Sequence, residues 1–137
     1  MMGHEINISN ARSELLVYPE LGNPVTLTKA SGAWAAYPTP TEIIPVNTIT
    51  SDFDICSVSV NTISDAGDYT LALYKGLVGS EVKLCSIPIS RTATASQEGS
   101  LLTGIIKLPM NTRISAAISG SNAAQNTLTT KIQYHRY

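Results

Sequence analysis

The chain has 137 residues, a formal net charge of −1, and only 14% charged residues. This length is enough for one domain with its own core. Typical soluble domains have about 25% charged residues. We therefore expect serine and threonine hydroxyl groups to occupy much of the surface where other proteins carry charges. The nine lysines and arginines are scattered singly, which argues against a nucleic-acid partner. No apolar run approaches the roughly 20 residues of a membrane span, and the polar start predicts no signal peptide.

The first half of the chain predicts an arm, two short strands and a long loop. Residues 1–14 predict an extended N-terminal arm, and residues 15–137 predict the single folded domain. Strands are expected over 15–18 and 25–28, on either side of a turn that contains two prolines. Three prolines in the stretch 29–45 argue against any regular element there.

The second half of the chain alternates apolar and polar residues, which is typical of half-buried strands. In the first of these strands, Cys56, Val58 and Val60 share one parity. Pro88 suits an edge strand or a bulge, because proline lacks the N–H that a central strand donates. With turns every 8–12 residues, about eight strands predict an all-β protein, a sandwich or a barrel. These later strands are expected over 53–60, 69–75, 81–89, 101–108, 114–119 and 127–134.

The aromatic residues and cysteines each leave two interpretations open. Trp34 lies near Tyr37 in the proline-rich stretch. Trp34 either anchors this loop to the core or is buried in a partner subunit, since tryptophan and tyrosine are enriched at interfaces. Cys56 and Cys85 fall within predicted strands, where we interpret them as small buried hydrophobic residues. A disulfide between them stays open, because it depends on the strand order.

Residues able to perform chemistry are few, and none matches a catalytic motif. Neither histidine has metal-ligand spacing, and His135 is interpreted as a strand-end or interface residue rather than a general base. Asp52 and Asp54 could join Asp65 and Asp68 in a calcium site. We prefer ordinary turn chemistry for the second pair, because the chain has no ladder of ligands like that of an EF-hand. The chain has no nucleophile elbow, dinucleotide fingerprint or phosphate-binding loop. We therefore expect neither an enzyme nor a cofactor.

Several segments, taken in order, resemble a family of small structural proteins from tailed bacteriophages. The likeness extends from roughly Gly32 to Tyr137, about three-quarters of the chain, and the segment before this range lies outside it. The similar segments are Gly32-Ala33-Trp34, IIPVNTITSDF (43–53), YTLALYKGLVGSEVKL (69–84), LPMNTRISAAIS (108–119) and the terminal IQYHRY (132–137).

The resemblance implies a single antiparallel β-sandwich of jelly-roll type, on the outer surface of a capsid that assembles in the host cytoplasm. The resemblance further implies a decoration or cement protein without catalytic residues. Its expected partners are the major capsid protein and other copies of the chain, with which it would form a trimer. The arm could add a strand to a neighbour's sheet edge, and repeated modest contacts would gain strength from valency. The expected interface residues are Ile6, Ile8, Leu15, Leu16, Val17, Trp34, Tyr37, His135 and Tyr137.

Two other functions stay open at the level of the sequence. A module of the tail, neck or fibre could bind a receptor, with Trp34, Tyr37 and Tyr74 stacking on sugars. A small hydrolase of host surface polymers could use paired acids such as Asp52 and Asp54, although no sequence motif favours it.

Overall fold

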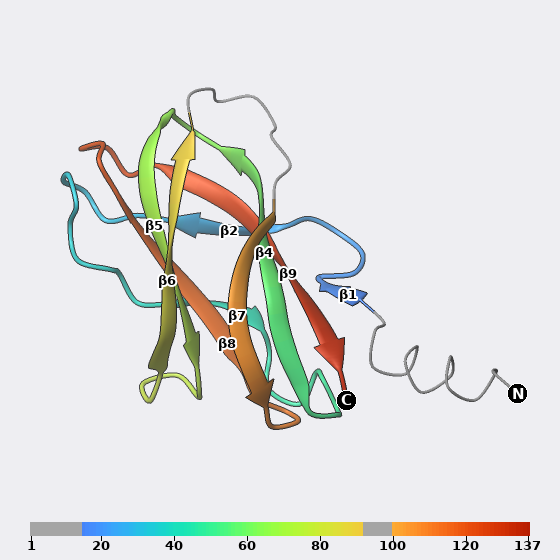
Figure 1. The fold of residues 1–137 in the computed structure, drawn as a ribbon. Coiled ribbons are helices and arrows are strands. Elements are labelled where there is room, and N and C mark those ends of the chain that lie inside the picture. Colours follow the sequence, from blue (N-terminus) through green and yellow to red (C-terminus); the bar gives the residue numbers. More distant parts are fainter. Residues whose placement is uncertain (1–14, 92–99) are drawn as a thin grey trace, which may run out of the picture.

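The structure is a computed structural model that describes residues 15–91 and 100–137, which form nine strands and no helix (Figure 1). The chain is thus all-β over these residues, as the sequence predicts. This part of the molecule accordingly contains no helix with the length and hydropathy to cross a bilayer. The strands are β1 (Leu15–Tyr18), β2 (Val25–Thr28), β3 (Thr41–Ile44), β4 (Phe53–Ile63), β5 (Gly67–Lys75), β6 (Val82–Arg91), β7 (Ser100–Leu108), β8 (Ile114–Gly120) and β9 (Thr127–Arg136).

The strands form two antiparallel sheets in a sandwich. The first sheet has the order β1-β9-β4-β7, and β2 pairs with the same side of β9 as β1, further along that strand. The second sheet has the order β3-β8-β5-β6. Among the described pairings only β5–β6 joins consecutive strands. The consecutive strands β1 and β2 both pair with β9, and every other connection crosses from one sheet to the other. This is the double Greek-key order of a jelly roll, which confirms the expected fold class.

The sequence reasoning missed one strand, β3. Prolines at positions 38, 40 and 45 flank it, and they indicated an irregular stretch. The four residues between them nevertheless pair with β8, and a register shift at Glu42/Ile44 lets the adjacent Ile43 and Ile44 both be buried. The expectation for Pro88 is confirmed, since β6 lies at the edge of its sheet and, among the residues that the structure describes, pairs with β5 alone.

Strand β4 departs from simple alternation at two bulges. Its register against β9 shifts between Ile55 and Ser57 and again between Val60 and Thr62. Each bulge adds one residue, so the inward parity changes along the strand. The predicted parity that grouped Cys56 with Val58 and Val60 is therefore wrong, because the first bulge turns Cys56 out of the fully buried set. The core residues of β4 are Phe53, Ile55, Val58, Val60 and Ile63.

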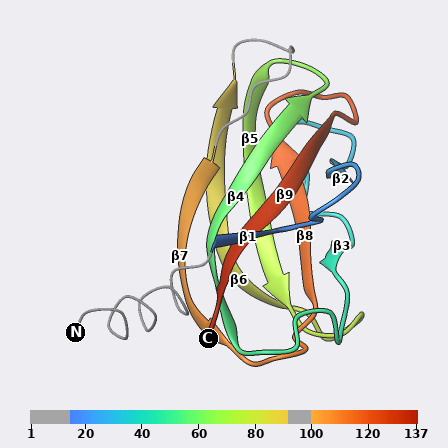
Figure 2. The ribbon, with the colours of Figure 1, turned by 90° about the vertical axis from the view of Figure 1, so that its right-hand side faces the viewer.

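Every residue of β8 is buried, on both faces of its sheet. Ile114, Ala116 and Ile118 belong to the core between the sheets. On the outer face, the Ser119 hydroxyl donates to the Ala35 carbonyl oxygen at 2.7 Å. The segment before β3 thus crosses outside β8, as both views show (Figures 1 and 2). Small side chains on this face of β8 allow the segment to approach closely.

Candidate binding surfaces

The loop that carries Trp34 is fixed by a buried lysine. The side chain of Lys29 is 1% exposed, and its Nζ donates to the carbonyl oxygens of Ala30, Gly32, Asn122 and Ala124 at 2.7–2.9 Å. An ammonium group has three N–H donors, so four acceptors satisfy it completely. The cation therefore ties the loop after β2 to the loop between β8 and β9.

Backbone hydrogen bonds complete this attachment and leave the indole ring outside. Trp34 N–H donates to the Gly120 carbonyl at 2.6 Å, and Gly32 N–H donates to the Ala123 carbonyl at 2.7 Å. Trp34 has φ 53°, in the left-handed region that a bulky residue rarely adopts. The residue is 54% exposed. Trp34 therefore does not anchor the loop to the core, and the first of the two interpretations of this residue is wrong. The loop is held instead by Lys29.

Tyr37 lies further along the same segment and is half-buried. The Lys83 ammonium lies 5.4 Å from the centre of the Tyr37 ring, a cation–π distance. Burial raises the pKa of the neighbouring Tyr74 hydroxyl, and Tyr37 adds to this rise. Of the three aromatic residues expected to stack on sugars, Trp34 is thus the exposed one.

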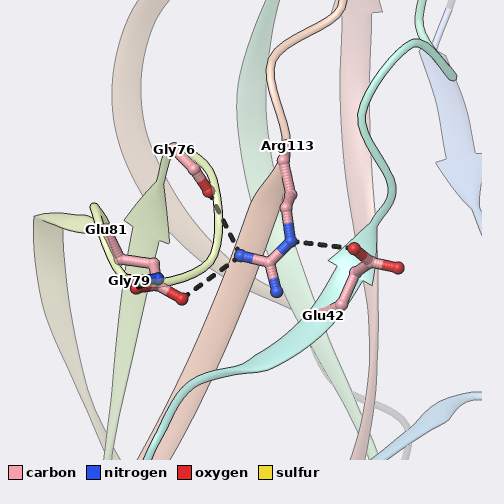
Figure 3. Close-up of polar contacts among 5 residues, drawn as sticks. All are labelled: Glu42, Gly76, Gly79, Glu81 and Arg113. Carbon is pink, nitrogen blue, oxygen red and sulfur yellow. Dashed lines mark hydrogen bonds and ion pairs between the residues drawn. The ribbon is translucent and has the colours of Figure 1, made fainter.

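At the opposite end of β8, Arg113 joins three separate segments (Figure 3). Its side chain is 5% exposed, and its Nε lies 2.8 Å from Glu42 of β3. Its Nη1 lies 3.3 Å from Glu81 and donates to the Gly76 carbonyl at 3.1 Å. Hydrogen bonds from the backbone N–H of Glu81 itself, from Gly79 N–H and from Arg113 lower the pKa of the Glu81 carboxyl. The ion pairs fix the β5–β6 hairpin against β3 and β8.

Beside Arg113 lies an apolar groove of about 410 Å³, which we call the end groove. Val46, Leu77 and Val82 line the groove and are 44–59% exposed. Val78, in the turn between β5 and β6, and Met110, in the turn between β7 and β8, are also exposed. A gathering of exposed apolar side chains marks an interaction surface more often than scattered ones do. The end groove is lined by Val46, Lys75, Gly76, Leu77, Ser80, Val82, Pro109, Asn111, Thr112 and Arg113.

The expected interface residues at the C-terminal end form a polar cluster on β4. His135 Nδ1 lies 3.3 Å from an Asp54 oxygen, and the Tyr137 hydroxyl donates to the other Asp54 oxygen at 3.1 Å. Lys107 Nζ lies 5.0 Å from the centre of the Tyr137 ring. Tyr137 N–H also donates to the Asp52 carbonyl at 2.8 Å. These contacts fix the chain end against its own sheet.

The residues expected to form the arm interface divide into two groups. Leu15, Leu16 and Val17 lie on β1, which pairs with β9 of the same chain. Leu15 remains 53% exposed. Ile6 and Ile8 lie outside the described residues.

The four acidic residues considered for calcium are occupied by contacts within the chain. Asp65 accepts from the Asn126 side chain and Asp68 from the Ser90 hydroxyl, each at 2.7 Å. Asp52 accepts from Met110 N–H at 2.9 Å, and Asp54 contacts His135 and Tyr137 as described above. Across the described ranges no three acidic, histidine or cysteine residues gather as metal ligands would. The carboxylates of Asp65 and Asp68 thus accept hydrogen bonds from side chains distant in sequence, rather than from the local backbone that ordinary turn chemistry would supply.

Cys56 and Cys85 are both free and only partly buried. They lie on different sheets, on β4 and β6. Burial raises the pKa of both thiols above its ordinary value of 9.0. Neither cysteine is therefore as buried as the sequence analysis expected, although Cys85 packs against the core as a partly buried residue.

No family model matches the chain. No curated protein matches it either. Several solved structures are similar, among them Eiger TNF from S. frugiperda, at 12% identity with a TM-score of 0.44 over 84% of this chain and 85% of that one. The infectious bursal disease virus VP2 subviral particle matches at 12% identity and a TM-score of 0.38, over 92% of this chain. This chain spans only 34% of the VP2 chain.

A tobacco streak virus coat protein is also similar, at 14% identity with a TM-score of 0.34, over 85% of this chain and 88% of that one. Two of these three solved structures are thus virus particle or coat proteins, and one is not. At these identities and TM-scores the likeness is one of strand arrangement and says nothing about function. The bacteriophage resemblance therefore stays a prediction from the sequence.

Proposed function

We propose that this chain is a non-enzymatic structural protein of a tailed-bacteriophage virion, a decoration or cement protein that binds the outer capsid surface and stabilises the head. The observation that carries the proposal is the exposed Trp34 ring on a loop fixed by the buried Lys29. A large aromatic side chain in a fixed position loses little entropy on binding, and such residues dominate interface energetics. The strained backbone at Trp34 is a further mark of a functional position.

The partners in this proposal are the major capsid protein and other copies of the chain, with a trimer favoured. Trp34 and the adjacent Tyr37 segment would contact the capsid. The arm, with Ile6 and Ile8, would contact a neighbour. His135 pairs with Leu15 of β1, and His135 and Tyr137 would lie within the interface with that neighbour.

Binding to capsids prepared without this protein tests the proposal. We expect the wild-type chain to co-sediment with such capsids and to raise the temperature at which they disrupt. Trp34→Ala should fold normally, because the ring is exposed, and should lose most of the binding. Leu21→Ala changes another exposed side chain, in the β1–β2 loop, and should bind as the wild type does. Absence of wild-type binding would refute the capsid role.

A tail, neck or fibre module that binds a glycan is the second candidate, and the same exposed Trp34 ring favours it. A flat aromatic face that is open to solvent can stack on a sugar ring as well as on a protein. Glycan-array binding that Trp34→Ala abolishes would support this candidate. A blank array combined with capsid binding would leave the decoration function alone.

A further inference from the structure

The end groove is an apolar surface that the Trp34 contact does not use. The backbone N–H of Trp34 donates a hydrogen bond to Gly120, the last residue of β8, whereas Arg113 directly precedes the first residue of that strand. Seven residues of strand separate the two ends, which corresponds to roughly 20 Å. A capsid contact through Trp34 would therefore leave the end groove free for a second partner.

The chemistry of the end groove specifies what it can bind. Its walls include Val46, Leu77, Val82 and Pro109, so it can bury apolar side chains. The two cationic residues that line the groove, Arg113 and Lys75, differ in whether they form ion pairs. Arg113 is already neutralised by two glutamates, whereas Lys75 has no ion-pair partner within the described ranges. The groove thus fits an extended apolar segment with one negative charge beside it.

The chain itself contains such a segment, ahead of β1. Residues 5–8 read Glu-Ile-Asn-Ile. In an extended conformation Ile6 and Ile8 point to the same side, because side chains alternate along a strand. The adjacent Glu5 supplies the negative charge. Fourteen residues precede Leu15, and an extended chain of that length reaches roughly 46 Å, far enough to meet a neighbouring molecule.

We propose that the end groove binds residues 5–8 of a second copy of this chain, with Ile6 and Ile8 against Leu77 and Val82 and with Glu5 beside Lys75. Every copy then contributes one arm and one groove, a heterologous contact that forms a closed ring when the rotation between neighbouring copies returns to the first one. The inference rests on the proposed function for the role of the arm. It adds the receptor surface and the charge pair.

Sedimentation velocity of the full chain over a range of concentrations tests this contact. We expect the wild type to form a closed oligomer. Leu77→Asp and Ile6→Asp should each weaken the oligomer about tenfold or more, because each places a charge in an apolar contact. Leu21→Asp alters an exposed leucine outside the groove and should assemble normally. Circular dichroism spectra identical to wild type would show that each variant is folded.

A charge exchange makes the test specific to the proposed pair. Glu5→Lys and Lys75→Glu should each weaken the oligomer, and the double variant should restore it. A wild type that is monomeric at every concentration would overturn the inference. An oligomer that Ile6→Asp leaves intact would overturn it too, as would a double variant as weak as the single ones. Capsid binding by monomeric variants is a separate measurement, so its outcome bears only on the proposed function.

Discussion

The Nζ of Lys29 donates a hydrogen bond to the carbonyl oxygen of Asn122 at 2.7 Å, across 93 residues of sequence. This contact and its three companions replace the apolar anchor that a loop of this length would ordinarily use. The loop can therefore expose its tryptophan and still be held in one position. A fixed loop with an exposed aromatic ring is the arrangement on which the proposed capsid contact depends.

Replacing Lys29 by methionine should destabilise the fold by about 3 kcal/mol, because four carbonyl oxygens would lose the charged donor that the buried lysine supplies. Chemical denaturation followed by circular dichroism measures this change. Lys83→Met is the matched control, since Lys83 is exposed and its ammonium lies over the Tyr37 ring rather than among carbonyl oxygens. The control should cost less than about 1 kcal/mol. Equal losses would contradict the role assigned to Lys29.

Gly76 and Gly79 lie in the same hairpin and should differ in their tolerance of alanine. At Gly76, with φ 116°, an added Cβ would lie 2.9 Å from the Ser80 carbonyl oxygen. At Gly79, with φ 86°, an added Cβ would have no atom within 4 Å. Gly79→Ala should therefore cost only the left-handed conformation, about 1–2 kcal/mol. Gly76→Ala should cost clearly more in the same denaturation experiment, and the reverse order would be inconsistent with this hairpin geometry.

Glu81 should make the fold sensitive to acid. Its pKa is lowered from the ordinary value of 4.5, first by its own backbone N–H and then by Gly79 and Arg113. A carboxylate with a lowered folded-state pKa stabilises the fold above its ordinary pKa and loses that contribution as the pH falls through the folded value. The stability of Glu81→Gln should therefore fall less than that of the wild type between about pH 5 and pH 3. Parallel curves for the two proteins would show that the carboxylate contributes nothing.

Both cysteines should react slowly while the protein is folded. Burial raises each thiol pKa above 9.0, so little of the reactive thiolate exists at neutral pH. Titration with a thiol-specific disulfide reagent should proceed slowly in buffer and rapidly in denaturant, with two thiols per chain in each case. Cys56→Ser and Cys85→Ser assign the two reactions. Fast labelling of the folded protein would contradict the described burial.

The sequence predicts most of the fold, because apolar and polar residues alternate along most of the strands. Strand β5 is an example, since Tyr69, Leu71 and Leu73 are predicted to face one side and all three lie in the core. Prediction fails where local rules compete with tertiary contacts. Strand β3 is too short and too close to prolines to be seen, and it exists because β8 offers an edge. The bulge after Ile55 has no sequence signature, so the parity of Cys56 could not be read.

The binding surfaces were less predictable than the fold. Trp34 was identified from its residue type, but its exposure depends on Lys29, a residue that sequence reasoning passed over as one scattered charge. Arg113 was missed in the same way, because its partners Glu42 and Glu81 are distant in sequence. Only the jelly-roll strand order brings these groups together. The available signal was that Lys29 and Arg113 each lie beside a loop in a chain with only 14% charged residues, where a cation can be expected to have a structural role.

Electron microscopy of intact particles, with density resolved for this chain, tests whether the chain decorates the capsid. We expect a jelly roll at regular positions over the capsid lattice, with the Trp34 loop against the capsid surface and the end groove facing a neighbouring copy. Density for this chain only at the tail or neck, or its absence from the head, would contradict the decoration function.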